Sequence, residues 1–343
     1  MVDLKNMTID ELEKFFVDIG ETKYRAKQVF QWIYRGVTNF EEMTDLKKEL
    51  RKKLNSIAYI SSLKIAQKLV SDADETAKYL FLLDDENIVE GVAIKYSYGN
   101  TSCISTQVGC NMKCSFCASG IGGKVRNLKA SEMIDEVLIM DNDYGKISNI
   151  VLMGSGEPFD NYEEVMKFIK IVNNPFGMGV GIRHITISTC GIVPKIYDFA
   201  NEGLGVNLSI SLHAPTDDLR TQLMPINKVY PIKDLIKACK YYIDKTHRRV
   251  TFEYSLIKDV NDNYEMSVKL SKLLRGLLCH VNLIPINYVD EIGYKKADNE
   301  KIIAFKNTLE KNGITCTVRR ELGSDINAAC GQLRRKYLAG RVK

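Results

Sequence analysis

Helix-type spacing of apolar residues dominates the first 57 residues. Three segments show it: TIDELEKFFVDIG (8–20), YRAKQVFQWIYRG (24–36) and DLKKELRKKL (45–54). Each repeats apolar side chains every three or four residues, as one buried helix face requires. Thr8 and Glu11 form a capping box at the start of the first segment, and Gly20 ends it. We therefore predict a small helical accessory domain over residues 1–57.

From residue 58 the pattern changes to strand-like runs. Three of them, joined by polar turns, predict a β-rich extension over residues 58–95: IAYISSLKIAQKLV (57–70), AKYLFLLDD (77–85) and IVEGVAIKYS (88–97). Seven more follow: CISTQVG (103–109), NIVLMG (149–154), HITISTCG (184–191), VNLSISLHA (206–214), RVTFEYSLI (249–257), HVNLIPIN (280–287) and ITCTVRRE (314–321).

Helical patterns separate most of these seven runs. One is NYEEVMKFIKIV, with Asn161 as its N-cap. Such alternation predicts parallel strands in an α/β sheet or barrel, which we place at residues 96–335, before a basic tail at 336–343. Ligand sites in these folds lie at the carboxyl ends of the strands, where this chain has polar or glycine-rich text.

Charge and composition narrow the function only slightly. The net charge is +5, from 48 basic and 43 acidic residues. Four basic clusters stand out: LKKELRKKL (46–54), HRR (247–249), VRRE (318–321) and LRRKYLAGRVK (333–343). Each alone is typical of a solvated surface, but together they leave an anionic polymer as a candidate substrate. No apolar run is long enough to span a membrane, and the amino terminus lacks a secretory signal, so we expect a cytoplasmic protein.

A cysteine cluster is the strongest chemical signal. Cys110, Cys114 and Cys117 have C-x-x-x-C-x-x-C spacing. Because cytosolic thiols stay reduced, such a cluster indicates metal binding or catalysis more often than disulfides. A closed zinc site needs four ligands, and no fourth is placed nearby, although His213 or His280 could supply one from elsewhere in the sequence. Three cysteines on a 4Fe–4S cluster leave one iron open for a substrate.

This spacing, with Phe116 before the last cysteine, resembles the signature of radical S-adenosylmethionine (SAM) enzymes. In those enzymes the open iron binds SAM, which is cleaved to a 5′-deoxyadenosyl radical. Seven motifs, in this order, resemble the RlmN/Cfr family of adenine methyltransferases: CISTQVGCNMKCSFCASG, MGSGEPFDN, ISTCGIVP, SISLHAP, LMPIN, VNLIPIN and INAACGQL. The segment GETKYRAKQVFQWIYRGVTNFEEMTDL also resembles the accessory domain of that family, so the match covers nearly the whole chain.

The resemblance implies an incomplete (β/α)6 barrel and a set of SAM contacts by motif position. These are Gly156, Glu157, Ser188, Ser211, Leu212, His213 and Asn287. It also implies that Cys330 takes a methyl group from one SAM, while a second SAM provides the radical that activates this methyl group. Cys103 then forms a disulfide with Cys330 and releases the methylated base. Glu90 matches the position of the proton acceptor, although the residue alone would equally suit a solvated strand.

The implied substrates are an adenosine of the peptidyl-transferase centre in 23S rRNA and the adenosine 3′ of the anticodon in tRNA. We expect a monomer, an external flavodoxin- or ferredoxin-like electron donor, and phosphate contacts from the helical domain and the carboxyl-terminal tail. Pro158 and Pro285 resemble the branch that methylates adenine C2. Two alternatives stay open: a Cfr-like C8 methyltransferase, and a non-catalytic RNA-binding protein held together by a metal.

Overall fold

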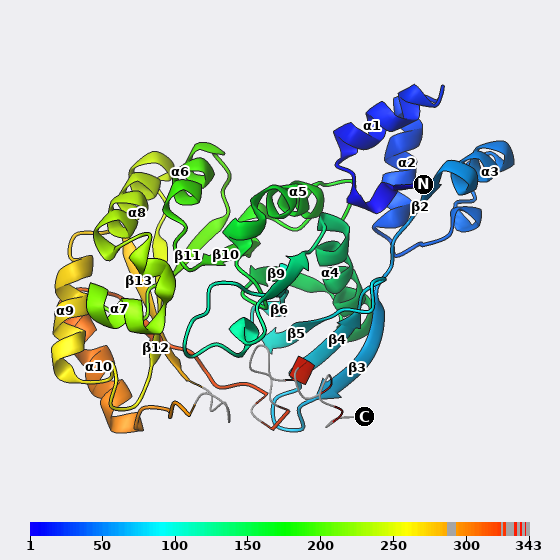
Figure 1. The fold of residues 1–343 in the computed structure, drawn as a ribbon. Coiled ribbons are helices and arrows are strands. Elements are labelled where there is room, and N and C mark those ends of the chain that lie inside the picture. The colour runs from blue at the N-terminus through cyan, green and yellow to red at the C-terminus, as the bar shows by residue number, and fades with distance from the viewer. Residues whose placement is uncertain (287–292, 324, 327–332, 335–336, 338–339, 341–343) are drawn as a thin grey trace.

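The computed structural model describes residues 1–286, 293–323, 325–326, 333–334, 337 and 340. The amino-terminal lobe contains α1 (Ile9–Asp18), α2 (Lys23–Ile33) and α3 (Lys48–Ile57), with short 3-10 turns η1 (Leu4–Asn6) and η2 (Phe40–Glu42). Strands β1 (Val2–Asp3) and β2 (Ala58–Tyr59) pair in parallel at its base. The predicted capping box is confirmed, since Thr8 and Glu11 bond reciprocally. Figure 1 shows this lobe standing apart from the large sheet.

One ten-stranded sheet forms the rest of the framework. Its spatial order is β14–β13–β12–β11–β10–β9–β6–β5–β4–β3. The bounds are β3 (Lys64–Val70), β4 (Ala77–Leu82), β5 (Ile88–Tyr96), β6 (Gly99–Cys103), β9 (Ile147–Leu152), β10 (Ile185–Thr189), β11 (Asn207–Ser211), β12 (Val250–Leu256), β13 (Cys279–Pro285) and β14 (Cys316–Val318). Within this sheet, β6 and β9–β14 run parallel, which confirms the predicted α/β alternation, and β3–β5 continue the same sheet in antiparallel pairing.

The predicted strand over residues 103–109 is interrupted. The sheet strand β6 ends at Cys103, and β7 (Gln107–Gly109) pairs instead with β8 (Lys124–Asn127) in a separate small sheet. Between them the backbone turns toward the segment that follows β9. Gly154 N donates to Ile104 O at 3.0 Å, and Thr106 N donates to Ser155 O at 2.8 Å. These bonds replace the pairing that a continuous strand would have made.

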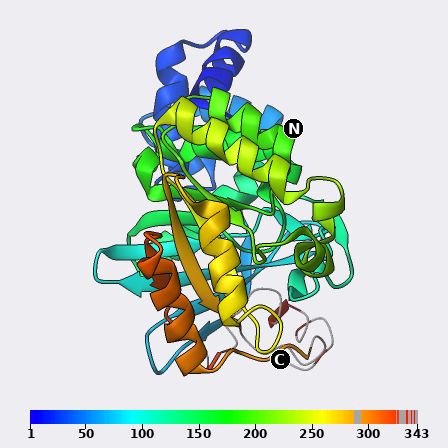
Figure 2. The same ribbon diagram turned by 90° about the vertical axis from the view of Figure 1, so that its left-hand side faces the viewer.

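Helices cover the outer face of the sheet, and several of them lie in front of the strands in Figure 2. They are α4 (Ala130–Tyr144), α5 (Tyr162–Asn173), α6 (Val193–Asn201), α7 (Asp217–Leu223), α8 (Ile232–Thr246), α9 (Tyr264–Leu274) and α10 (Asn299–Lys311), with 3-10 turns η3 (Ala118–Gly120), η4 (Pro158–Asn161), η5 (Ile182–His184) and η6 (Pro225–Lys228). None of the helices in the described ranges is long and apolar enough to cross a membrane.

Apolar and polar residues alternate along the parallel strands. In β10, Ile185 and Ile187 belong to the buried core beneath the helices, whereas Thr186 and Ser188 lie on the opposite, inner face. Parallel strands covered on both faces are nearly continuous hydrophobic runs. Because these strands alternate instead, their inner face carries polar side chains that can contact a polar ligand. In the described part of the chain β3 and β14 are the two ends of the sheet, as expected for an incomplete barrel.

Candidate functional site

The cluster loop (residues 110–123) lies at the carboxyl ends of the parallel strands. Ser115 N donates to Leu223 O at 2.9 Å, which fixes the loop to the end of α7. Cys114 and Phe116 pack against a small apolar group formed by residues that end α7 or follow β10, β11, α7, β12 and β13: Cys190, Ala214, Leu223, Met224, Ile257 and Ile286. This is the edge of the sheet at which we predicted the ligand site.

Burial and mutual repulsion disfavour the thiolate forms of the loop cysteines. Burial, assisted by the charge of the nearby Cys117, raises the pKa of Cys110 to about 12. The pKa of Cys114 is also raised by burial, then by the charges of Cys117 and Cys110. The three thiols are thus near neighbours that a bound cation would have to hold as thiolates. Cysteine binds a metal as the thiolate. These three residues therefore suit a metal group whose positive charge is large enough to lower the pKa values of the thiols.

Three loop cysteines suit a 4Fe–4S cluster better than a closed zinc site, which needs four ligands. Within the described ranges no three His, Cys, Asp or Glu side chains converge as tightly as one metal ion needs. His280 Nε2 lies 2.8 Å from Thr317 Oγ1, away from the cysteines. A cluster places its cysteine ligands on different iron atoms and therefore farther apart. Cys110, Cys114 and Cys117 could hold such a cluster.

Gly156 and Glu157 form a tight corner after β9. The φ angle of Gly156 is 109°, and a Cβ atom there would lie 2.7 Å from Thr106 Oγ1, so only glycine fits. The buried Glu157 carboxylate accepts bonds from Thr189 Oγ1 at 2.6 Å and from Cys190 N at 2.7 Å. Burial raises the pKa of Glu157. Its side chain therefore joins the ends of β9 and β10, and its SAM contact stays a prediction.

The two predicted serines meet at a carboxylate that we did not predict. Glu253 Oε2 on β12 accepts bonds from Ser188 Oγ at 2.7 Å and from Ser211 Oγ at 3.1 Å. Ser211 pairs in register with Glu253, and the carboxylate is nearly buried. The one sequence signal for it is a charged residue at an inner position of the strand VTFEYSL. The structure thus brings Ser188 and Ser211 together around Glu253.

Leu212 and His213 turn the chain sharply after β11. Both backbone N–H groups donate to Glu253 O, at 3.0 and 3.2 Å. His213 has a left-handed backbone, with φ 57°, and its Nδ1 accepts from Ser255 N at 2.9 Å. Burial, assisted by the charge of Arg220, lowers the pKa of His213 to about 3. The imidazole is therefore neutral, with its proton assigned to Nε2.

Arg220 is a second unpredicted residue of this network. Its guanidinium is fully buried and donates to Cys190 O at 2.6 Å, Leu212 O at 3.2 Å and Asn227 Oδ1 at 2.9 Å. The bonds bridge the ends of β10 and β11. Burial lowers the pKa of Arg220, and the three carbonyl acceptors offset part of the cost of burying its charge. Nothing in the sequence around it distinguishes this arginine.

Cys103 and Glu90 lie on the inner face of adjacent strands. Cys103 pairs with Val92, and Glu90 stands two residues from Val92 on β5, so both side chains share one face of the sheet. Both are nearly buried. Glu90 forms a buried ion pair with Lys78 on β4, 3.2 Å apart, and also accepts from Arg334 N at 2.5 Å.

Two predicted residues, Cys330 and Asn287, lie outside the described residues. Along the sequence, the described residues nearest to Cys330 are 333 and 334. Leu333 packs with Leu80 and Ile88, and Arg334 N bonds to Glu90. This part of the carboxyl-terminal segment therefore lies against β4 and β5, on the same face as Glu90.

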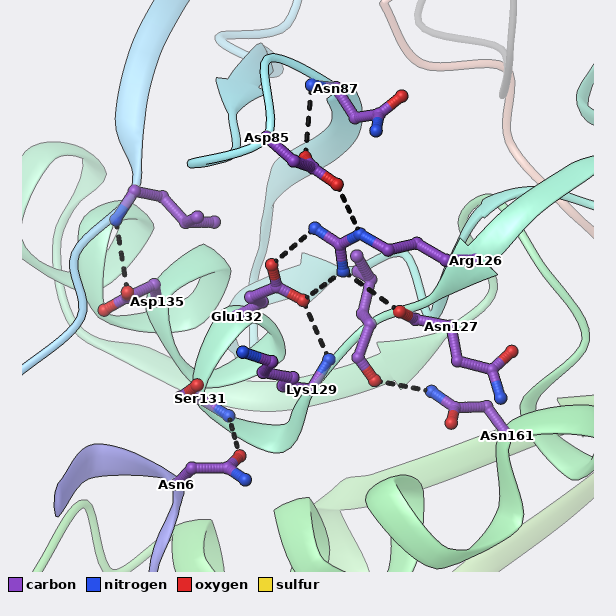
Figure 3. Close-up of polar contacts among 12 residues, drawn as sticks. Asn6, Asp85, Asn87, Arg126, Asn127, Lys129, Ser131, Glu132, Asp135 and Asn161 are labelled. Carbon is purple, nitrogen blue, oxygen red and sulfur yellow. Dashed lines mark hydrogen bonds and ion pairs between the residues drawn. The ribbon is translucent and has the colours of Figure 1, made fainter. Parts of the chain in front are cut away.

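Arg126 lies on β8, directly after the cluster loop, and Figure 3 shows its contacts with Asp85 and Glu132. Its guanidinium binds both carboxylate oxygens of Glu132 on α4, at 2.7 and 2.8 Å, and Asp85 at 2.6 Å. Asn161 also contributes, because its amide donates to Leu128 O at 2.8 Å. We predicted Asn161 as the N-cap of a helix. It does precede α5, but its side chain makes no capping bond.

The amino-terminal lobe is fixed to α4 by buried polar contacts. Lys5 Nζ forms an ion pair with Asp135, and both side chains are almost fully buried. Asn6 Oδ1 accepts a bond from Ser131 N at 2.9 Å. Since Glu132 of the same helix binds Arg126, α4 links the lobe to the cluster loop.

Comparison with known proteins agrees with this geometry. Residues 2–60 match the family described as the ribosomal RNA large subunit methyltransferase N-terminal domain, and residues 104–270 match the radical SAM superfamily. A crystal structure of a radical SAM methyltransferase from Sphaerobacter thermophilus superposes with a TM-score of 0.92 at 44% sequence identity. The match covers 97% of this chain and 99% of that one.

Two curated relatives match over nearly their whole length. The "probable dual-specificity RNA methyltransferase RlmN" of Thermoanaerobacter sp. (strain X514) is 71% identical and covers 99% of this chain and 100% of its own. The protein of the same name from Clostridioides difficile (strain 630) is 52% identical, over 97% of this chain and 98% of its own.

The fold, the cysteine loop and the superposition define a radical SAM methyltransferase. Within that class, identity of this degree over the full length places the chain in the RlmN family. Enzymes of this class use a 4Fe–4S cluster and SAM, and the donor set of the cluster loop is compatible with the former.

Proposed function

We propose that the chain methylates C2 of an adenosine in the peptidyl-transferase centre of 23S rRNA and of the adenosine 3′ of the anticodon in tRNA. RNA as the substrate is supported by the relatives, which are named dual-specificity RNA methyltransferases. Their family membership argues for an enzyme and against the non-catalytic RNA-binding alternative. An external flavodoxin- or ferredoxin-like electron donor, a monomeric state and a cytoplasmic location stay predictions.

When bound, the cluster and SAM would supply a 5′-deoxyadenosyl radical for hydrogen abstraction. Cys110, Cys114 and Cys117 would hold the cluster. The backbone at Gly156, Glu157, Leu212 and His213, the Ser188 and Ser211 hydroxyls, and Asn287 would bind SAM. The hydrogen bonds around Glu253 and Arg220 already fix the ends of β10 and β11, so this part of the site is preorganised.

In our proposal the reaction uses two SAM molecules in a ping-pong sequence. Adenine carbon is a poor nucleophile, whereas the Cys330 sulfur can displace a methyl group from the first SAM and become S-methylcysteine. After hydrogen abstraction by the radical from the second SAM, this carbon would add to the base, and the adduct would lose one electron to the cluster and the proton of its target carbon to Glu90. Cys103 would then attack the sulfur of Cys330, forming a disulfide as the carbon–sulfur bond to the base breaks, and the departing methylene carbon would take up a proton to give the methylated base.

One observation carries this assignment of the catalytic groups. Cys103 and Glu90 share the inner face of two neighbouring strands, and Arg334, four residues after Cys330, bonds to Glu90. The residues that we propose as proton acceptor and resolving thiol, and the segment that follows the proposed methyl carrier, therefore occur in one region. The buried Lys78 supplies the counter-charge for Glu90.

A Cfr-like C8 methyltransferase is the main alternative. Pro158 begins η4 directly after Glu157, and Pro285 ends β13 two residues before Asn287. Proline restricts φ and removes an N–H, so both can shape the loops that present the base. We expect methylation of a 23S rRNA fragment with deuterated adenine to remove deuterium at C2. Loss at C8 with retention at C2 would assign the enzyme to the other branch.

A further inference from the structure

A second polar region lies at the end of the sheet opposite the cluster loop. Residues at the amino ends of β10 and β12 and at the turn between β5 and β6 line an open cavity system on the inner face. It comprises one cavity of ≈ 600 Å³ and another of ≈ 490 Å³. The two share four lining residues: Met153, Thr186, Asn207 and Asn282. Neither the cluster nor the predicted SAM contacts explain this region.

The edge of these cavities is strongly basic. Arg183 and His184 immediately precede β10, and Arg248 and Arg249 immediately precede β12. No acidic residue is among the described residues that line the larger cavity, and Glu253 is the single one in the smaller. Arg183 and Arg249 are exposed, and neither forms an ion pair with any residue that the structure describes. Their charges are therefore available to an anionic ligand.

An aromatic pair lies beside these cations. The rings of Tyr96 and Tyr98 stack with centroids 5.0 Å apart and planes 6° apart. Tyr98 is 69% exposed and lines the same cavity as Arg183 and His184. A large aromatic ring held rigid by a stacked partner, yet open to solvent, is a typical platform for an unpaired base.

We propose that this amino-end rim, formed by Tyr96, Tyr98, Arg183, His184, Arg248 and Arg249, binds a single-stranded segment of the RNA substrate. The arginines would take phosphates, which positions the strand without reading its sequence. Tyr98 would stack a base. The inference rests on RNA being the substrate, and it assigns a binding surface that the methylation chemistry itself does not require.

The cavity system connects this rim to the reaction site. Thr186 and Asn207 line both cavities, and the smaller one extends along the inner face to Glu253. Glu253 in turn holds Ser188 and Ser211, which are predicted SAM contacts. An RNA strand at the rim could therefore present an extruded base toward SAM from the amino ends of the strands.

An acidic electron-transfer protein is the other anionic partner that such a surface could attract. The position argues against it, because the cluster loop lies at the carboxyl ends of the strands and the rim at their amino ends. Electron delivery requires a close approach to the cluster. RNA is accordingly the partner that the stacked tyrosines and the connected cavities favour.

Binding of a fluorescent RNA hairpin with an unpaired loop, measured by anisotropy on the full chain without SAM at several salt concentrations, tests the rim. Tyr98→Ala should weaken binding by about 5- to 150-fold, the range for one base–aromatic stack. It should leave the salt dependence unchanged. Tyr98→Phe, which keeps the ring, should bind within about twofold of wild type. Arg183→Gln with Arg249→Gln should lower the salt slope by about 1.4, or about 0.7 for each phosphate contact to a single strand.

The matched control is Lys240→Gln with Arg275→Gln, which removes two exposed cations at α8 and after α9. It should change the affinity for RNA and the salt slope less than the Arg183→Gln, Arg249→Gln variant does. If wild type methylates RNA but the rim variants bind it as wild type does, the rim assignment is wrong and the proposed function stands. The rim assignment is equally wrong if the rim variants lose affinity for an acidic flavodoxin but not for RNA. If wild type neither binds nor methylates RNA, the proposed function itself fails.

Discussion

The ring of Phe116 meets the imidazole of His213 edge-on, with centroids 4.8 Å apart and ring planes at 73°. Phe116 belongs to the cluster loop, and His213 belongs to the turn after β11. The contact therefore couples the cysteine ligands to the region of the predicted SAM contacts. Because burial keeps the imidazole neutral, no charge in this pair opposes a cationic group nearby.

Removing one loop cysteine tests the cluster assignment. After anaerobic reconstitution, Cys114→Ala should fold, contain little iron, and neither cleave SAM nor methylate RNA. The matched control is Cys316→Ala, because Cys316 is a buried thiol that lies on β14, outside the cluster loop. It should keep the brown colour and broad absorption near ~400 nm that iron–sulfur ligation gives. Full iron content and turnover in Cys114→Ala would refute the assignment.

The two distant thiols should give different failures. Cys330→Ala should assemble the cluster but transfer no methyl group, because the methyl acceptor is gone. Cys103→Ala should accept a methyl group on Cys330 and then stall as a covalent protein–RNA adduct. Gel mobility before and after RNase digestion detects that adduct. Normal product release by Cys103→Ala would show that another group resolves the intermediate.

Local signals in the sequence were sufficient for much of the framework. The capping box at Thr8 and Glu11 depends on residues three positions apart, and the structure has it as predicted. The α/β alternation likewise follows from neighbouring residues. The interruption after Cys103 does not, because it depends on backbone bonds from residues 104–106 to a segment about 50 residues later.

The same distinction explains the residues that sequence reasoning missed. Ser188 and Glu253 are 65 positions apart and meet only because β10, β11 and β12 are neighbours in the sheet. Arg220 acts through backbone carbonyl groups, which carry no sequence signature. Motif resemblance could nominate the serines, but it could not show which carboxylate orients their hydroxyl groups.

Glu253 should act as a positioning residue for the two serines. Glu253→Gln keeps the shape but replaces a carboxylate that accepts from both hydroxyls with a neutral amide. Hydrogen bonds to charged groups contribute about 1.5–3 kcal/mol. If the substitution loses about 1.4 kcal/mol of the energy that orients the two hydroxyls, SAM should bind roughly tenfold more weakly. Calorimetric titration measures it, with the exposed Glu265→Gln as the control. Ser188→Ala in the Glu253→Gln background should add little, and additive losses would argue against a shared role.

The buried ion pair between the lobe and α4 should be worth more than the exposed one. Lys5→Met leaves Asp135 charged and buried, and such losses typically cost about 3–5 kcal/mol of unfolding free energy. Replacing both partners, with Lys5→Met and Asp135→Leu, should recover most of it. Lys167→Met breaks the partly exposed pair with Glu11 and should cost no more than about 1 kcal/mol. Denaturant titration compares the four proteins, and equal losses for the two lysines would contradict the difference in burial.

His213 should make the fold sensitive to acid. Its pKa is about 3 in the folded protein and near 6.5 when unfolded, so between these values only the unfolded chain binds the proton. The stability due to neutral His213 is therefore complete above pH ~6.5 and falls by about 1.4 kcal/mol per pH unit below it.

His213→Asn removes the titrating group and keeps an acceptor near Nδ1 on a residue that tolerates positive φ. From pH 6.5 to 5 the wild type should lose about 2 kcal/mol more than this variant in denaturant titrations. His247, also at positive φ but exposed, provides a control for the effect of the His-to-Asn substitution itself. Parallel pH profiles for wild type and His213→Asn would mean that His213 is protonated in the folded state.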